Sequence, residues 1–122
     1  MGAKRNRING IKKEGELQKV LEENGVFSLS LAPNIAGDII LPVHKIVIEV
    51  KSTKQYFSPF ATEKLKKQYE KLLSYNEQGL VTYYAVFFNF KKEWKFFPTP
   101  LEHTRYEEGL SIVQFIEKIN KT

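Results

Sequence analysis

The chain is predicted to form an α/β domain in which a mixed sheet of about five strands is flanked by helices. Its 122 residues suffice for one hydrophobic core. A hydrophobic content of 42% and an aromatic content of 13% suit a packed globule rather than a disordered chain. The apolar patterns follow the order helix, three strands, helix, two strands, helix, so the middle helix crosses over between strands. We therefore expect residues 1–122 to form a single domain.

The first half of the chain predicts a helix and then three strands. Apolar residues recur at helical spacing over residues 11–24, and Gly25 gives this helix a stop. Short apolar runs bounded by turn residues follow over 26–31, 37–43 and 45–52. The last two runs are separated by only a short turn, so we expect them to pair as a hairpin.

The second half of the chain predicts a helix, two strands and a closing helix. Residues 61–76 have apolar positions at helical spacing and a basic outer face, and residues 109–121 carry one apolar stripe. Residues 93–100 read as a strand stopped by prolines. Residues 81–90 are apolar on both faces, as in a central strand. Either the chain covers both of these faces itself, or one face meets a second copy of the chain.

The composition excludes several classes of site and favours a polyanionic partner. Cysteine is absent, which excludes disulfides, zinc–thiolate sites, cysteine nucleophiles and iron–sulfur clusters. The net charge of +5 and the pI of about 9.3 favour nucleic acid, ahead of an acidic membrane surface. The alternative is a basic protein without such a partner. No apolar run suits a membrane span or a secretory signal, so we expect a cytoplasmic protein without a membrane partner.

Three charged residues lie inside the apolar hairpin: Asp38, Glu49 and Lys51. Charged side chains are rarely buried unless they are paired or bind a metal. Because side chains alternate along a strand, Glu49 and Lys51 share one face, and hairpin pairing brings Asp38 beside them. Two carboxylates placed in this way suit Mg²⁺, and a lysine beside them can orient an attacking water and offset phosphate charge. The alternative is an ordinary cross-strand salt bridge.

Glu14 lies on the apolar face of the first predicted helix, together with Leu17 and Leu21. A carboxylate on such a face is costly unless a cation or a metal matches it. We expect Glu14 to reach the same site as Asp38 and Glu49 from the helix packed beside the sheet. The alternative is a side chain that reaches solvent near the start of the helix, where the helix dipole favours negative charge.

These residues, in this order, resemble a known catalytic core. The chain resembles the PD-(D/E)xK nuclease core, which is restriction-endonuclease-like, in Glu14, Gly37-Asp38 and Glu49-Val50-Lys51. Within that superfamily it resembles the archaeal Holliday junction resolvases, including those carried by archaeal viruses. The resemblance covers most of the chain. KKEGELQKVLEENG resembles the family's first helix, GDIILPVHKIVIEVKSTK its catalytic hairpin, and YYAVFFNFKKEWKFFP its late strand pair.

The resemblance implies a role for each of these residues. Asp38 and Glu49 would be metal ligands, the backbone carbonyl of Val50 a further ligand, and Glu14 the acidic residue that completes the site. Lys51 would be the catalytic lysine. The family implies Mg²⁺, with Mn²⁺ as a substitute, and no small-molecule cofactor. It also implies a homodimer that makes paired cuts across a four-way DNA junction and leaves 5′-phosphate nicks that ligase can seal, in the cytoplasm of a cell or of a virus's host.

Several residues are expected to contact DNA. Residues 1–10 are expected to form a flexible basic arm, the alternative being a solvated tail without a partner. The loop 52–61 mixes Lys54 with aromatic residues that either stack on splayed bases or, as we expect, pack between subunits. Ser52 and Thr53 follow the motif where the family approaches phosphate. The full set of expected DNA contacts is Lys4, Arg5, Arg7, Lys12, Lys13, Ser30, Ser52, Thr53 and Lys54.

Two departures from the family's pattern remove charge that would contact phosphate. Many members have an arginine directly after the helix glutamate, where this chain has Gly15. Many have another before the aspartate loop, where Ser30 is nearest. We expect the basic residues of the N-terminal segment to compensate. Two other functions stay open: a related nuclease that acts on duplex, flap or single-stranded DNA, and a non-catalytic DNA-binding protein on the same fold.

Overall fold

The computed structural model describes the backbone of residues 2–101 and 104–121, and the side chains of residues 12–101 and 104–121. Its helices and strands follow the predicted order. They are α1 Gly2–Glu23, β1 Leu29–Ser30, β2 Ile39–Leu41, β3 Ile46–Thr53, α2 Glu63–Ser74, β4 Val81–Phe88, β5 Glu93–Pro98 and α3 Ile112–Asn120, with short 3₁₀ helices at Tyr75–Gln78 and Tyr106–Glu108.

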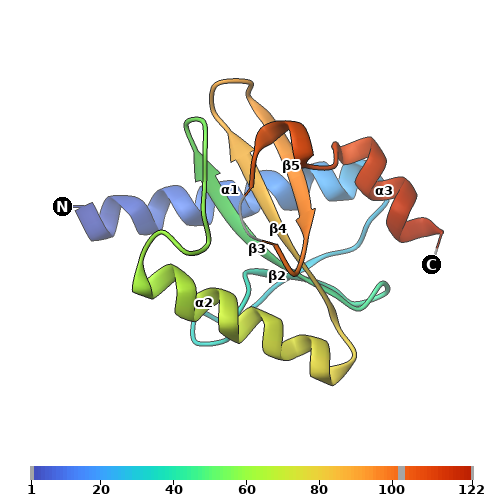
Figure 1. Ribbon diagram of the computed structural model, residues 1–122. Coiled ribbons are helices and arrows are strands. Elements are labelled where there is room, and N and C mark those ends of the chain that lie inside the picture. Colours follow the sequence, from blue (N-terminus) through green and yellow to red (C-terminus); the bar gives the residue numbers. More distant parts are fainter. Residues whose placement is uncertain (1, 102–103, 122) are drawn as a thin grey trace.

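The strands form one five-stranded mixed sheet in the order β1-β2-β3-β4-β5. β3 and β4 are parallel, and the other neighbouring pairs are antiparallel. Parallel neighbours need a crossover connection, and α2 provides it, as predicted (Figure 1). The α/β class and the mixed sheet of about five strands flanked by helices are therefore confirmed.

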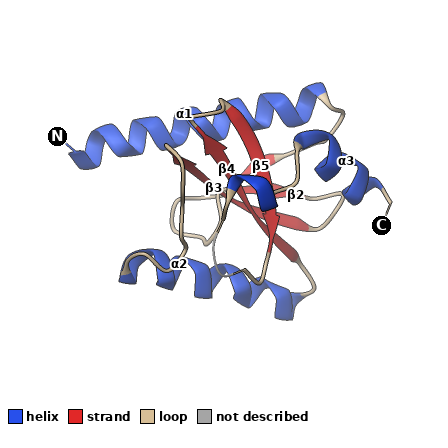
Figure 2. Cartoon of the chain, turned by 45° about the horizontal axis from the view of Figure 1, so that its top comes forward, coloured by secondary structure: helices blue, strands red, loops and turns tan. Residues whose placement is uncertain are grey.

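Helices cover both faces of the sheet, α1 and α3 on one side and α2 on the other (Figure 2). On the first side, Leu17 and Leu21 of α1 pack in one cluster with Phe115 and Ile119 of α3. On the second side, Leu72 of α2 packs with residues of β3 and β4 in a separate cluster. The sheet thus lies between two apolar cores, an arrangement typical of α/β domains.

β4 is covered on both faces within one chain. Tyr83 and Ala85 belong to the cluster beneath α1 and α3, whereas Tyr84, Val86 and Phe88 belong to the cluster beneath α2. All five side chains are buried. The sequence left open whether the chain covers both faces of this strand itself or whether one face meets a second copy. The structure supports cover by the chain itself. A second copy of the chain would have to bind elsewhere.

α1 is longer at its N-terminal end than predicted. It begins at Gly2 rather than near Ile11, so the stretch expected to be a flexible arm is helical. Lysine and arginine are good helix formers, and Gly10 lowers helix stability by only about 1 kcal/mol without breaking the helix. The helix boundary is therefore corrected, and the mobility of the basic segment stays a prediction. In the described part of the chain neither α1 nor any other helix combines the length and the apolar composition of a membrane span.

Candidate active site

The candidate site lies where β2 is too short to cover β3. β2 has three residues and β3 has eight, and their antiparallel register begins with Ile39 opposite Ile48. Asp38 directly precedes the first paired residue of β2. It makes the hydrogen bonds to β3 that a longer β2 would make. Its backbone N–H donates to the Ile48 carbonyl at 2.9 Å, and its carboxylate accepts the Val50 N–H at 2.7 Å. The carboxylate thus satisfies a backbone donor that no residue of β2 reaches.

Gly37 makes the turn that delivers Asp38 to this edge. Its φ is 88°, in the left-handed region that favours glycine. A Cβ atom at this position would also collide with the side chain of Val47. The turn next to the candidate ligand therefore requires glycine both for its backbone conformation and for its packing.

Three carboxylates converge at this edge. Glu14, Asp38 and Glu49 line one cavity of about 520 Å³ together with Gln68 and Lys71 of α2. The remaining lining residues are Leu31, Pro33, Asn34, Ile35, Ala36 and Gly37 from the loop before β2. Glu14 arrives from α1, as expected from its place beside the buried Leu17 and Leu21. Hairpin pairing and helix packing therefore bring together the three acidic residues predicted from the sequence.

The electrostatics of the cavity disfavour three negative charges without a cation. Burial, followed by a hydrogen bond with Asp38 and repulsion from Asp38 and Glu49, raises the pKa of Glu14 to about 8. Burial and repulsion from Asp38 raise the pKa of Glu49 to about 7, although Lys51 opposes this shift. Crowded, buried carboxylates hold protons at neutral pH unless a positive charge replaces those protons.

The donor set suits a hard divalent cation. No group of three or more His, Cys, Asp or Glu side chains in the described part of the chain is arranged to enclose a metal ion. Mg²⁺ needs fewer protein ligands than such a group provides, because it keeps several waters and takes one or two carboxylates plus substrate phosphate. The second oxygen of Asp38 and the carboxylate of Glu49 meet this need. The Val50 carbonyl points to the same uncovered edge as its N–H group.

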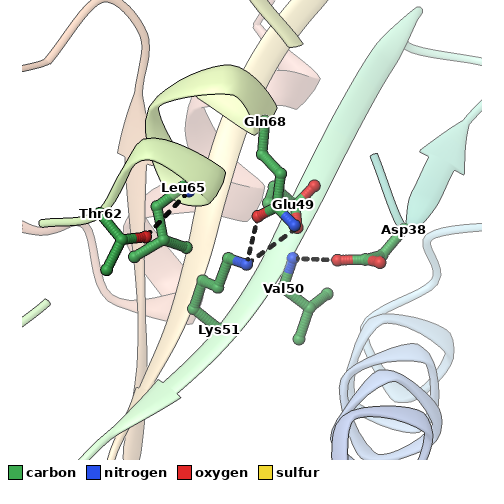
Figure 3. A network of polar contacts seen from close by, with 7 residues as sticks. All are labelled: Asp38, Glu49, Val50, Lys51, Thr62, Leu65 and Gln68. Atoms are coloured by element: carbon green, nitrogen blue, oxygen red, sulfur yellow. Dashed lines mark hydrogen bonds and ion pairs between the residues drawn. The ribbon is translucent and has the colours of Figure 1, made fainter. Parts of the chain in front are cut away.

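Lys51 lies beside the carboxylates, held by two acceptors (Figure 3). Its Nζ is 3.3 Å from Glu49 Oε2 and donates to Gln68 Oε1 at 2.8 Å. The prediction that Glu49 and Lys51 share one face of β3 is confirmed. The ion pair joins two residues of the same strand, so it is not the cross-strand salt bridge of the alternative, and it is one part of a larger polar site.

Gln68 is a site residue that was not predicted. It lies on α2, three residues after Leu65 and four before the fully buried Leu72. Positions at these spacings share a helix face. Glu14 was predicted as a site residue because it is a polar residue on the apolar face of its helix. The same criterion applied to α2 would have identified Gln68.

Two of the residues expected to contact DNA have partners within the chain. Lys13 forms an ion pair with Glu16 at 2.9 Å and lies 3.7 Å from the centroid of the Phe87 ring. Its charge is therefore engaged within the chain. The Thr53 hydroxyl donates to the Tyr56 carbonyl at 2.6 Å. The side chains of Lys4, Arg5 and Arg7 lie outside the described residues.

Of the remaining expected contacts, Lys12, Ser52 and Lys54 are exposed. Ser30 is also exposed, and its hydroxyl lies 3.3 Å from the side-chain carbonyl of Gln18. None of these four residues lines the cavity that holds the carboxylates. They are available to solvent, and contact with DNA stays a prediction for each of them.

Comparison with known proteins identifies the fold. No protein-family model matches the chain, and neither does any curated protein. A solved structure that is similar is Hjc, a Holliday junction resolvase from the archaeal hyperthermophile Archaeoglobus fulgidus. The match has a TM-score of 0.69 and 22% sequence identity, and it covers 89% of this chain and 96% of Hjc. The chain has the fold of this resolvase. The expected restriction-endonuclease-like core is therefore confirmed at the level of fold.

Proposed function

We propose that the chain is a Mg²⁺-dependent endonuclease that resolves four-way DNA junctions. One observation carries this proposal: Glu14, Asp38 and Glu49 meet at an uncovered sheet edge with Lys51 beside them. A bare salt bridge would need neither the extra carboxylates nor the cavity. The fold of Hjc supports the junction as substrate, and the net charge of +5 supports a polyanion.

In the proposed reaction each residue has a defined part. Asp38 and Glu49 would hold the metal, assisted by the Val50 carbonyl and by Glu14. A bound Mg²⁺, or Mn²⁺ in its place, would supply Lewis-acid charge for the scissile phosphate and for the attacking water. Lys51 orients the water for in-line attack on phosphorus and offsets the charge that grows on the phosphate oxygens. The water oxygen bonds to phosphorus as the bond to the 3′-oxygen breaks, and the 3′-oxygen leaves and takes up a proton from solvent.

Paired cuts require two such sites, so we propose that the protein acts as a homodimer, with one cavity for each of two opposed strands. Phosphate contacts outside the cavity would come from the exposed Lys12 and Lys54 and from the basic N-terminal segment. The products would be 5′-phosphate nicks that ligase can seal. The activity serves DNA recombination and repair, and we place it in the cytoplasm, or in the host's cytoplasm if a virus carries the gene.

The proposal is tested by cleavage of an immobile four-way junction, labelled at its ends. The protein is incubated with this junction, with a flap and with a linear duplex of matched sequence, in Mg²⁺ and in EDTA. We expect symmetric paired nicks in the junction alone, lost in EDTA. Equal cutting of all three DNAs would support the related nuclease with broader substrates. Tight junction binding without any cutting would support the non-catalytic DNA-binding protein.

A further inference from the structure

The Lys51 ammonium contacts one residue of the sheet and one residue of the helix that covers it. Glu49, two residues away on the same strand, approaches one side of it, and Gln68 of α2 approaches another (Figure 3). The contact with Gln68 is the shorter, at 2.8 Å against 3.3 Å. The Lys51 side chain is only 19% exposed, so water cannot fully replace a lost partner.

The two partners differ in what happens when a cation enters the cavity. Glu49 is a candidate ligand, and its oxygens cannot serve Lys51 and a divalent ion equally well. The cation also repels the ammonium. A lysine held by Glu49 alone would therefore move when the site fills. The amide oxygen of Gln68 carries no net charge, so it can hold Lys51 without drawing the cation away from Asp38 and Glu49.

Gln68 stands on a helix whose position is well fixed. The Thr62 hydroxyl caps α2 by accepting the Leu65 N–H at 3.1 Å. The residue after Gln68, Tyr69, is buried, and its hydroxyl exchanges hydrogen bonds with the backbone of Leu101. An anchored neighbour of this kind limits where the Gln68 amide can lie, as a positioning contact requires.

We propose that Gln68 is a positioning residue that keeps the Lys51 ammonium in its reactive place when the carboxylates are occupied by metal. The inference deepens the proposed function and rests on it. It assigns to α2 a part in the reaction that the hairpin motif alone does not contain. The amide acts through Lys51 and takes no part in bond making or breaking.

The variants that test this role are Gln68→Met, which keeps the length but removes the acceptor, and Gln68→Glu, which keeps an acceptor oxygen. Gln78→Met is the matched control, because Gln78 is exposed on the 3₁₀ helix after α2 and does not line the cavity. Thermal melting confirms that each variant is folded. The readouts are the single-turnover cleavage rate at saturating protein, the junction Kd, and the ¹⁵N NMR signal of the Lys51 ammonium, assigned by its loss in Lys51→Ala.

We expect Gln68→Met to lower the cleavage rate by roughly 10- to 100-fold with an unchanged Kd, since a small misplacement of a catalytic group has effects of this size. The ammonium signal should broaden beyond detection. Gln68→Glu should keep the ammonium signal, because its carboxylate still accepts from Lys51, but it should not restore the full rate, because its negative charge in the cavity draws the cation away from Asp38 and Glu49. Gln78→Met should match the wild type. A Gln68→Met variant that cuts at the wild-type rate and keeps the signal would overturn the inference. A wild type that never cuts but shows the expected NMR pattern would overturn the proposed function and leave the Gln68–Lys51 contact standing.

Discussion

The two sides of the sheet are built from different chemistry. Beneath α1 and α3 the buried cluster is almost wholly aliphatic and aromatic, and Phe96 and Phe115 stack there with ring centroids 4.1 Å apart. Beneath α2 the cluster includes Tyr69 and Tyr84, and Glu49 is buried on that side of β3. Burial and the nearby Glu49 raise the pKa of the Tyr84 phenol, so this side holds neutral polar groups around a carboxylate.

The difference teaches that the polar groups of the candidate site gather mainly on the α2 side of the sheet, with Glu14 of α1 as the exception. Apolar burial contributes to folding on both sides of the sheet. The α2 side keeps buried polar groups whose desolvation is compensated only in part by hydrogen bonds. A change in the apolar cluster beneath α1 and α3 should therefore act on folding, and a change among the polar groups on the α2 side should act on activity.

The largest effect is expected on the α2 side, from Lys51→Ala. Loss of the ammonium should lower junction cleavage by about 100- to 1,000-fold, the size found when a group that stabilises transition-state charge is removed. Junction binding should stay largely intact, because most DNA affinity comes from phosphate contacts elsewhere. Parallel cleavage and gel-shift titrations measure both. If binding fell as much as cutting, Lys51 would be a DNA contact and not a catalytic group.

On the α1–α3 side, Phe115→Ala should act on folding alone. Its ring is fully buried between Phe96 and Tyr83, so its loss should lower the free energy of unfolding by about 3–5 kcal/mol. The control on the same helix is Val113→Ala, which is 60% exposed and should change stability by less than about 0.5 kcal/mol. Urea unfolding measures both changes. A cleavage rate per folded molecule that fell with Phe115→Ala would contradict this difference between the two sides.

The raised carboxyl pKa values predict how stability changes with pH in the absence of divalent ions. The pKa values of Glu14 and Glu49 are raised from 4.5 to about 8 and about 7. Between pH 4.5 and about pH 8, Glu14 and Glu49 keep protons in the folded protein that they have released in the unfolded chain. Raising the pH therefore favours unfolding. The free energy of unfolding should therefore fall from about pH 4.5 to about pH 8 and then level off.

Melting temperatures measured in EDTA across this pH range check the trend. Glu14→Gln should flatten the upper part of the curve, because it removes the carboxyl with the highest pKa. Mg²⁺ should raise the melting temperature most above about pH 8, where Glu14 and Glu49 have lost their protons and can bind it. A wild-type curve that is flat in EDTA would mean that the three carboxylates do not crowd one another.

The smallest effect is expected from a gain of charge beside the site. Gly15 is exposed, and a Cβ there would meet nothing within 4 Å, so Gly15→Arg fits without strain. It should tighten junction binding and steepen the salt dependence by about one unit of the log–log slope. Gly15→Ala is the control, because it gives the same kind of gain in helix propensity without charge. Equal binding by both variants would place this surface away from DNA.

The sequence predicted the fold and the acidic site because both depend on periodicity. Alternation along residues 45–52 placed Glu49 and Lys51 together, and the helical stripe placed Glu14 toward the sheet. Two features of the site and its surroundings could not be predicted without the folded structure. Asp38 satisfies the Val50 N–H because β2 stops short, and strand length is poorly fixed by pattern. Lys13 lies against Phe87 because α1 packs on the sheet, and these two residues are far apart in sequence.

Binding of a divalent ion by the protein alone tests the central claim most directly, because it needs no DNA and no cleavage. Titration with Mn²⁺ followed by electron paramagnetic resonance at pH 8, with Mg²⁺ as competitor, compares the wild type with Asp38→Asn. The variant keeps an oxygen for the Val50 N–H and removes only the charge. We predict that the wild type binds Mn²⁺, that Mg²⁺ displaces it, and that Asp38→Asn weakens binding at least about tenfold. Binding that is absent, or equal in both proteins, would contradict a metal site at this sheet edge.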